Sequence, residues 1–121
     1  MATPNLVNVA TITPKNAMGA LGDTDRTTMI DVTAENAAKV DTILIANVDG
    51  TNACDVTLEI SNDNGSTFYK IASTISVPAD ATLSFLDATG PLWLDETDLL
   101  YVTAGTASDL SWAVSYSEMA D

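Results

Sequence analysis

The run Cys54-Asp55-Val56-Thr57-Leu58-Glu59-Ile60-Ser61 decides the fold class, because apolar and polar residues alternate along its whole length. Successive side chains of a β-strand point to opposite faces of the sheet. The apolar side chains that share one face are Cys54, Val56, Leu58 and Ile60. We therefore predict a strand with one buried face and one solvated face.

A tight turn follows this run. Asn62-Asp63-Asn64-Gly65 contains residues that tolerate a positive φ, which the turns of β-hairpins require. Residues 67–72 are again suited to a strand, so we expect them to return antiparallel beside residues 54–61.

The same short alternations continue along the chain. They predict strands near residues 27–32, 40–48, 75–77, 81–86, 98–103 and 109–116. Seven or eight strands at this spacing predict an all-β fold, an antiparallel β-sandwich of the jelly-roll or Ig-like kind. Residues 40–48 are apolar on both faces at their centre, which is typical of a central strand covered on both sides or of a contact with another subunit.

The N-terminal part looks different. Residues 6–13 are suited to a strand that ends at Pro14, and residues 15–25 are small and glycine-containing, as in a loop. Residues 34–39 have the composition of a single helical turn. We therefore divide the chain into an N-terminal strand, arm and loop over residues 1–26 and a β-sandwich over residues 27–121.

Charge excludes several classes of function. The 121 residues carry 17 Asp and Glu against four Lys and Arg, a formal net charge of −13. Nucleic-acid binding depends on basic residues that neutralise phosphates, so we expect no nucleic-acid partner. No apolar stretch is long enough to span a membrane, and the N-terminus lacks the features of a secretory signal. The single cysteine, Cys54, is expected to be a small buried residue.

Catalysis and cofactors are not expected. The chain has no histidine, which removes Ser-His and Cys-His nucleophiles and the commonest metal ligand. A carboxylate pair is formally available, but so many acids place some pair close together by chance. Residues 63–65 and 95–98 offer oxygen ligands for calcium, yet neither has EF-hand spacing, and both fit turns better. We predict a protein that is not an enzyme and has no metal or cofactor.

Two aromatic positions suggest contact surfaces. Phe68 and Tyr69 are neighbours, so they point to opposite faces of their strand, and an outward Phe68 would either contact a partner or be shielded by a loop. Trp93 could form a platform for a carbohydrate, although core burial or an edge-strand contact is the more common role of such a residue.

Four stretches resemble small structural proteins of tailed bacteriophages: residues 1–9, 43–53, 76–83 and 109–118. They contain turns and strand edges rather than a catalytic motif. The resemblance implies a β-sandwich subunit of the virion that is assembled in the host cytoplasm. The implied partners are the major capsid protein or other virion proteins.

From this resemblance we expect a capsid decoration, or cement, protein that binds and stabilises the outer surface of the head, as a homo-oligomer such as a trimer. A head-tail connector or tail subunit is the alternative in the same setting, and a glycan-binding module displayed on the virion is a second alternative. The residues expected to bind a partner are Leu6, Val7, Val9 and Ile12 of the arm, through strand addition, together with Phe68.

Overall fold

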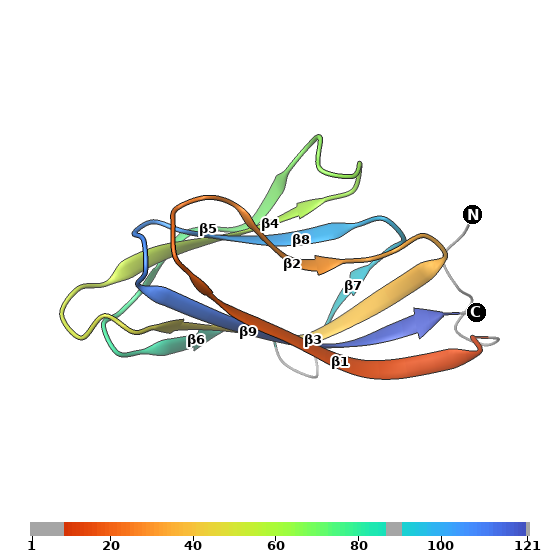
Figure 1. The fold of residues 1–121 in the computed structure, drawn as a ribbon, viewed down its shortest axis with the longest axis horizontal. Helices are drawn as coiled ribbons and strands as arrows, with labels where there is room; N and C mark the ends of the chain where they lie inside the picture. Colours follow the sequence, from red (N-terminus) through yellow and green to blue (C-terminus); the bar gives the residue numbers. More distant parts are fainter. Residues whose placement is uncertain (1–8, 87–90, 121) are drawn as a thin grey trace.

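The computed structural model describes residues 9–86 and 91–120, which form nine strands in two antiparallel sheets packed face to face (Figure 1). Sheet A has the order β1-β9-β3-β6, with β7 also paired to β3, and sheet B has the order β2-β8-β4-β5. The strands of sheet A are β1 (Thr11–Leu21), β3 (Asn36–Asn47), β6 (Thr82–Ser84), β7 (Leu92–Leu94) and β9 (Leu110–Ala120). The strands of sheet B are β2 (Thr27–Asp31), β4 (Cys54–Ser61), β5 (Tyr69–Val77) and β8 (Leu99–Ala104).

This strand order is that of a jelly roll. Along the chain the strands alternate between the two sheets, except for the β4-β5 hairpin and the short β6 and β7, which both flank β3. The predicted all-β sandwich is confirmed, and the jelly-roll alternative is the one that the topology supports.

The core lies between the sheets, where the inward residues of both meet. From sheet A, Val40, Ile43 and Ile45 are fully buried, and from sheet B so are Leu100 and Val102. Burying such side chains stabilises a fold by roughly 1.5–3 kcal/mol each relative to leaving them exposed. The packed apolar faces of the two sheets therefore hold the sandwich together.

Trp112 fills the part of this core beneath β1. Its partner in the β1-β9 register is Gly19, and a Cβ atom at Gly19 would lie 3.2 Å from the indole ring. That distance is tighter than ordinary van der Waals contact. The glycine therefore lets β1 lie directly over the ring, which is only 8% exposed.

β4 begins and ends as the alternating run predicts, and it pairs with β5 through Ile60 opposite Tyr69 and Glu59 opposite Lys70. Its second face is not uniformly solvated, however. Glu59 is 5% exposed and Ser61 is fully buried. Glu59 is paired with Arg26, which is 33 positions away, and Ser61 Oγ bonds to Asp63 and Gly65 of the following turn. The alternation could not reveal either contact.

The N-terminal prediction needs correction. β1 does not end at Pro14 but runs to Leu21, pairing with β9 without a register shift, so residues 15–21 are strand rather than loop. A proline is compatible with an edge strand because one side of such a strand makes no ladder bonds. Residues 11–21 thus belong to sheet A, and Leu6 and Val7 lie outside the described residues.

The expected helical turn at residues 34–39 is also wrong, because β3 begins at Asn36 and pairs with β9 from there. β3 lies in the interior of sheet A, as expected for residues 40–48, but it is not covered on both sides, and the alternative of a contact with another subunit stays a prediction. Leu44 points to the outer face and is 39% exposed, so β3 is fully covered only on its inner face. Among the described residues, no helix has the length and apolar character that a membrane span needs.

Candidate interaction surfaces

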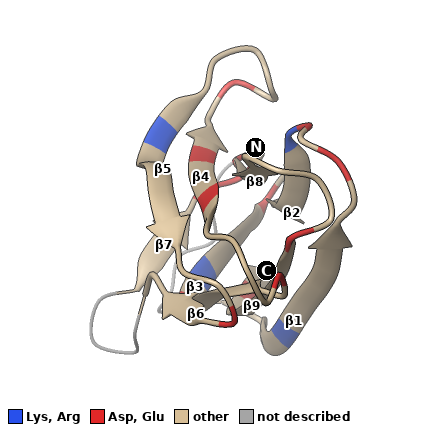
Figure 2. Cartoon of the chain, turned by 90° about the vertical axis from the view of Figure 1, so that its left-hand side faces the viewer, with Lys and Arg blue, Asp and Glu red and all other residues tan. Residues whose placement is uncertain are grey.

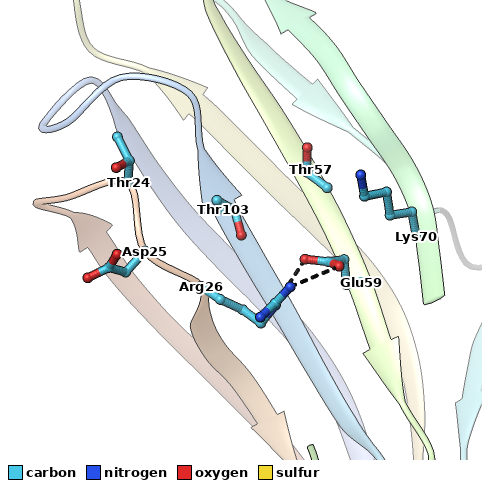
Figure 3. Close-up of a pocket in the computed structure, with 7 residues that line it drawn as sticks. All are labelled: Thr24, Asp25, Arg26, Thr57, Glu59, Lys70 and Thr103. Atoms are coloured by element: carbon cyan, nitrogen blue, oxygen red, sulfur yellow. Dashed lines mark hydrogen bonds and ion pairs between the residues drawn. The ribbon is translucent and has the colours of Figure 1, made fainter. Parts of the chain in front are cut away.

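The outer face of sheet B carries a polar hollow of about 360 Å³ near the start of β2 (Figure 3). Two of the chain's four cations, Arg26 and Lys70, line it together with Glu59. The other lining residues are Thr24, Asp25, Thr57 and Thr103. The two cations are balanced by the carboxylates of Asp25 and Glu59, so the lining of the hollow has no net formal charge.

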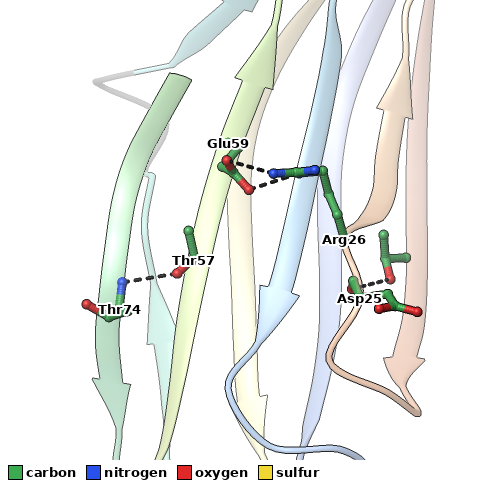
Figure 4. Close-up of polar contacts among 6 residues, drawn as sticks. Asp25, Arg26, Thr57, Glu59 and Thr74 are labelled. Atoms are coloured by element: carbon green, nitrogen blue, oxygen red, sulfur yellow. Dashed lines mark hydrogen bonds and ion pairs between the residues drawn. The ribbon is translucent and has the colours of Figure 1, made fainter. Parts of the chain in front are cut away.

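An ion pair crosses this hollow (Figure 4). The Arg26 Nε–H and Nη2–H groups donate to the two carboxylate oxygens of Glu59, at 3.0 and 3.3 Å. The same guanidinium lies 3.6 Å from the ring centroid of Phe68, which packs edge-on against Tyr101 at 5.3 Å. Arg26 therefore ties the entry to β2 onto β4 and covers the aromatic pair.

This arrangement limits what the hollow can do chemically. Glu59 already neutralises Arg26, so the cation left for an anionic ligand is Lys70, which lies opposite Glu59 on β5. The threonine hydroxyls could hydrogen-bond a polar group, but the hollow holds no imidazole or thiol to act as a nucleophile or base. We interpret the pair as a structural tie. No local pattern predicts this pair, because Arg26 and Glu59 are 33 positions apart.

The outer face of sheet A carries a second hollow, an apolar groove of about 490 Å³. It runs over β9 between β1 and β3, and Thr82 of β6 closes one side. We call it the sheet A groove; its side chains include Met18, Leu44, Ala46, Thr82, Ser111 and Ala113, and no charged residue lines it. Met18 is 67% exposed and Leu44 is 39% exposed.

Acidic residues lie mostly away from this groove. Figure 2 shows red segments on the loops that join the strands and on β4. The residues of β1 that share a face with Met18 are Ile12, Pro14, Asn16 and Ala20, and their β9 neighbours are serine and alanine over much of that strand. The groove has no charged residue in its lining, although the Lys39–Asp41 ion pair lies farther along the same face, and on a chain with a net charge of −13 it is a candidate contact surface.

The two acidic turns considered for calcium are occupied by internal hydrogen bonds. Asp63 Oδ1 accepts from Ser61 Oγ and from the N–H groups of Ser66 and Thr67, and hydrogen bonds from Thr67 lower the pKa of Asp63 to about 2. In the second turn Asp98 Oδ2 accepts from Asp95 N–H, and burial raises the pKa of Asp98. Within the described ranges, no group of three or more acidic or cysteine side chains is arranged to hold a metal ion.

The residues predicted to bind a partner occupy different places. Val9 is half-buried just before β1, and Ile12 is 62% exposed on β1. Phe68 does not project freely, because Arg26 and Tyr101 cover its ring. Trp93 is 48% exposed on β7, opposite Lys39, so core burial does not apply to it. The sheet A groove was not predicted as a whole, although the apolar outer position of Leu44 was a signal.

Comparisons with known proteins show the fold and no family. No protein-family model matches the chain, and no curated protein matches it. A subunit of the disulfide-linked pili of Bacillus endospore appendages has a TM-score of 0.54 and 13% identity, covering 100% of this chain and 92% of that one. The Drosophila NLP core, described for its pentamer formation and histone binding, has a TM-score of 0.51 and 12% identity, covering 87% and 97%.

A pentameric capsid protein from metagenomic phage sequences is a more distant match, with a TM-score of 0.38 and 14% identity, covering 98% of this chain and 64% of that one. At that score the match supports no argument. The two matches with TM-scores above 0.5 show that the fold of this chain is shared with proteins of a pilus and of a pentamer.

Proposed function

We propose that this chain is a structural protein of a tailed-phage virion, a capsid decoration protein that binds the outer surface of the head and stabilises it. The observation that carries the proposal is the distribution of charge on the jelly roll. The acids are concentrated on loops, and the groove on the outer face of sheet A is lined by no charged residue. The similarity of residues 1–9, 43–53, 76–83 and 109–118 to small phage structural proteins supports the virion setting.

The physical demands on a decoration protein fit these features. Such a protein must stay soluble before assembly and must not compete for DNA, and a net charge of −13 serves both needs. It must also hold a preformed lattice through many weak contacts, whose combined avidity greatly exceeds that of one contact. We propose the major capsid protein as the partner.

The free edge of β1 is the proposed contact with the capsid protein. β1 pairs with β9 over all its residues and lies at the end of sheet A, and no other described strand pairs with its second edge. Because Pro14 has no N–H group, we propose strand addition at the residues on either side of it. Ile12 adds an exposed apolar side chain beside this edge, on the outer face of sheet A. Leu6, Val7 and Val9 precede β1 and extend this proposed contact.

Image reconstruction of the virus particle tests the proposed function. Hundreds of copies of this chain on the head surface are expected of a decoration protein. Density restricted to the head-tail junction or tail, in small multiples of six or twelve, would instead support a connector or tail subunit and would contradict the proposal.

A truncation tests the proposed contact. Removal of residues 1–9 leaves β1 intact, so the truncated chain is expected to keep its circular dichroism spectrum and melting temperature but to lose binding to undecorated heads. Ile12→Lys in the full chain is expected to weaken binding, whereas Ile71→Lys on β5 is the matched control. Full binding by both the truncated chain and Ile12→Lys would contradict a role for this edge.

Trp93 keeps the glycan-binding alternative open to experiment, because its indole is half-exposed on β7. Exposed aromatic rings of this kind stack on sugars. Binding on a glycan array that is lost in Trp93→Ala would favour that alternative over a purely structural role.

A further inference from the structure

We propose that the outer face of sheet A is a self-association surface, on which a second copy of this chain packs about a two-fold axis. This inference concerns the isolated protein and does not depend on the proposed virion role. It rests on the shape, charge and size of the face around the sheet A groove.

The shape of the groove is self-complementary. In the strand register Met18 and Leu44 both lie beside Ala113, one on β1 and the other on β3, so two large side chains flank a small one. In the next outward row Ala20 and Ala46 flank Ser111, and all three are small. A two-fold axis can therefore place the large side chains of each copy over the small-residue floor of the other.

The charge of the groove disfavours a basic partner and permits a second copy. A basic partner would be attracted to the acidic loops, whereas the groove offers such a partner no carboxylate. Two copies, each with a net charge of −13, can meet at this face without burying a carboxylate from the groove, and Asp41, which lies beside the groove on the same face, is paired with Lys39 at 3.4 Å. Their long-range repulsion is then the main electrostatic term that opposes association, and salt screens it.

The size of the face predicts weak association. A strand of 11 residues such as β9 is about 36 Å long, and three neighbouring strands are about 14 Å wide, which gives about 500 Å² per copy. Two copies would thus bury about 1,000 Å² in total, near the lower limit of specific interfaces. We therefore expect a dimer at micromolar or higher concentrations.

The β5 edge is the competing apolar surface, since Tyr69, Ile71 and Ile75 are all exposed on it. Its pairing with β4 contains two register shifts, and Thr74 has a positive φ of 47°. Such irregularities disfavour the addition of another strand. This edge therefore supplies control positions with similar exposure.

Sedimentation velocity of the full chain, from micromolar to millimolar concentration and in low and high NaCl, tests the proposal. The expected result is a monomer-dimer equilibrium that shifts toward dimer as salt is added. A protein that stays monomeric throughout, a trimer, or association weakened by salt would overturn it.

Paired substitutions locate the surface. Leu44→Glu and Leu44→Lys each place an unpaired charge in the interface, so both should weaken dimerisation by more than about tenfold. Ile71→Glu and Ile71→Lys make the same changes of charge outside it. If net charge alone governed association, Leu44→Lys would strengthen dimerisation, because it makes the chain less negative. Stronger dimerisation of Leu44→Lys would therefore overturn the proposed face. A loss of dimerisation confined to the Ile71 variants would overturn it as well. Unchanged melting temperatures show that the variants are folded.

A thiol-protection measurement provides an independent readout. Cys54 is buried, so a thiol introduced by Ala113→Cys is the reactive one. Its reaction with a maleimide should slow as protein concentration rises, whereas a thiol introduced by Ser73→Cys on β5 should react at a constant rate. Equal behaviour of the two thiols would contradict the proposal.

Discussion

Arg26 shows how one side chain can hold several distant elements together. It neutralises Glu59, which is almost completely buried, and its guanidinium lies on the Phe68 ring. A buried carboxylate without a partner is costly, whereas the paired carboxylate is tolerated because two N–H groups donate to it. The stabilising effect of Arg26 therefore includes both packing and charge.

We predict that Arg26→Ala lowers the free energy of unfolding by roughly 1–3 kcal/mol, because it leaves Glu59 unpaired and uncovers Phe68. Urea unfolding at pH 7 measures the change. Lys15→Ala, which removes the more exposed pair with Glu118, is the matched control and should cost less. The double variant Arg26→Ala, Glu59→Gln should recover part of the loss. Equal effects of the two single variants would contradict this role of Arg26.

Asp63 organises the β4-β5 turn through its carboxylate, and its depressed pKa sets a pH dependence. The pKa of Asp63 is about 2 in the folded chain, whereas a carboxyl group without these partners has a pKa of 3.8. Between these two pH values the unfolded state therefore binds more protons than the folded state. The stabilising contribution is complete above pH 4 and is lost as pH falls toward 2.

We predict that Asp63→Ala lowers the urea midpoint at pH 6, and that the difference from the unsubstituted chain shrinks as pH falls from 4 to 2. Asp63→Asn keeps an oxygen that can accept from Thr67 N–H and is expected to have a smaller effect. A difference that stays constant over this pH range would show that the charge of Asp63 is not involved.

At the scale of strands, the sequence predicted those elements whose partners reinforce the local pattern. The alternation of residues 54–61 gave β4 because the hairpin partner is adjacent in the chain. The prediction for residues 36–39 is wrong because their alanine-rich composition favours a helix, whereas pairing with distant β9 makes them a strand. Pro14 predicts a strand end only where both edges of the strand are paired, and the sequence does not reveal that β1 lies at an edge.

The candidate surfaces were harder to predict than the strands, for the same reason. The Arg26–Glu59 pair and the sheet A groove both form from residues that the topology brings together over long separations. Only individual residues of these surfaces, such as the outward apolar Leu44, can be identified from the local sequence pattern. Ile12 and Val9 were identified from the arm, and their partner-binding role stays a prediction.

The bulge in β5 contains a strained residue, which leads to a testable prediction. Thr74 adopts a positive φ of 47°, which is unfavourable for a β-branched residue, and its N–H donates to Thr57 Oγ1. We predict that Thr74→Gly raises the free energy of unfolding by about 0.5–1 kcal/mol, because glycine adopts this φ without strain. Thr57→Val should lower it, since the hydrogen bond is lost. Thermal unfolding followed by circular dichroism measures both, and a destabilised Thr74→Gly would show that the threonine is not strained.

At the scale of the whole molecule, two electrostatic effects of salt oppose each other. The described residues contain three ion pairs, formed by Lys15, Arg26 and Lys39, and salt weakens such pairs. Exposed pairs contribute only about 0–1 kcal/mol each. The net charge of −13 destabilises the compact state by self-repulsion, and salt relieves that repulsion.

We predict that the second effect dominates, so that the melting temperature at pH 7 rises as NaCl increases from 10 to 150 mM, over which the screening length falls from about 30 to about 8 Å. Sucrose at matched osmolality controls for effects unrelated to charge. Near pH 4 the chain approaches its pI of about 4.1, and the salt effect should disappear because little net charge is left to screen. A melting temperature that falls with salt at pH 7 would mean that the ion pairs, Arg26–Glu59 above all, outweigh the repulsion among the acids.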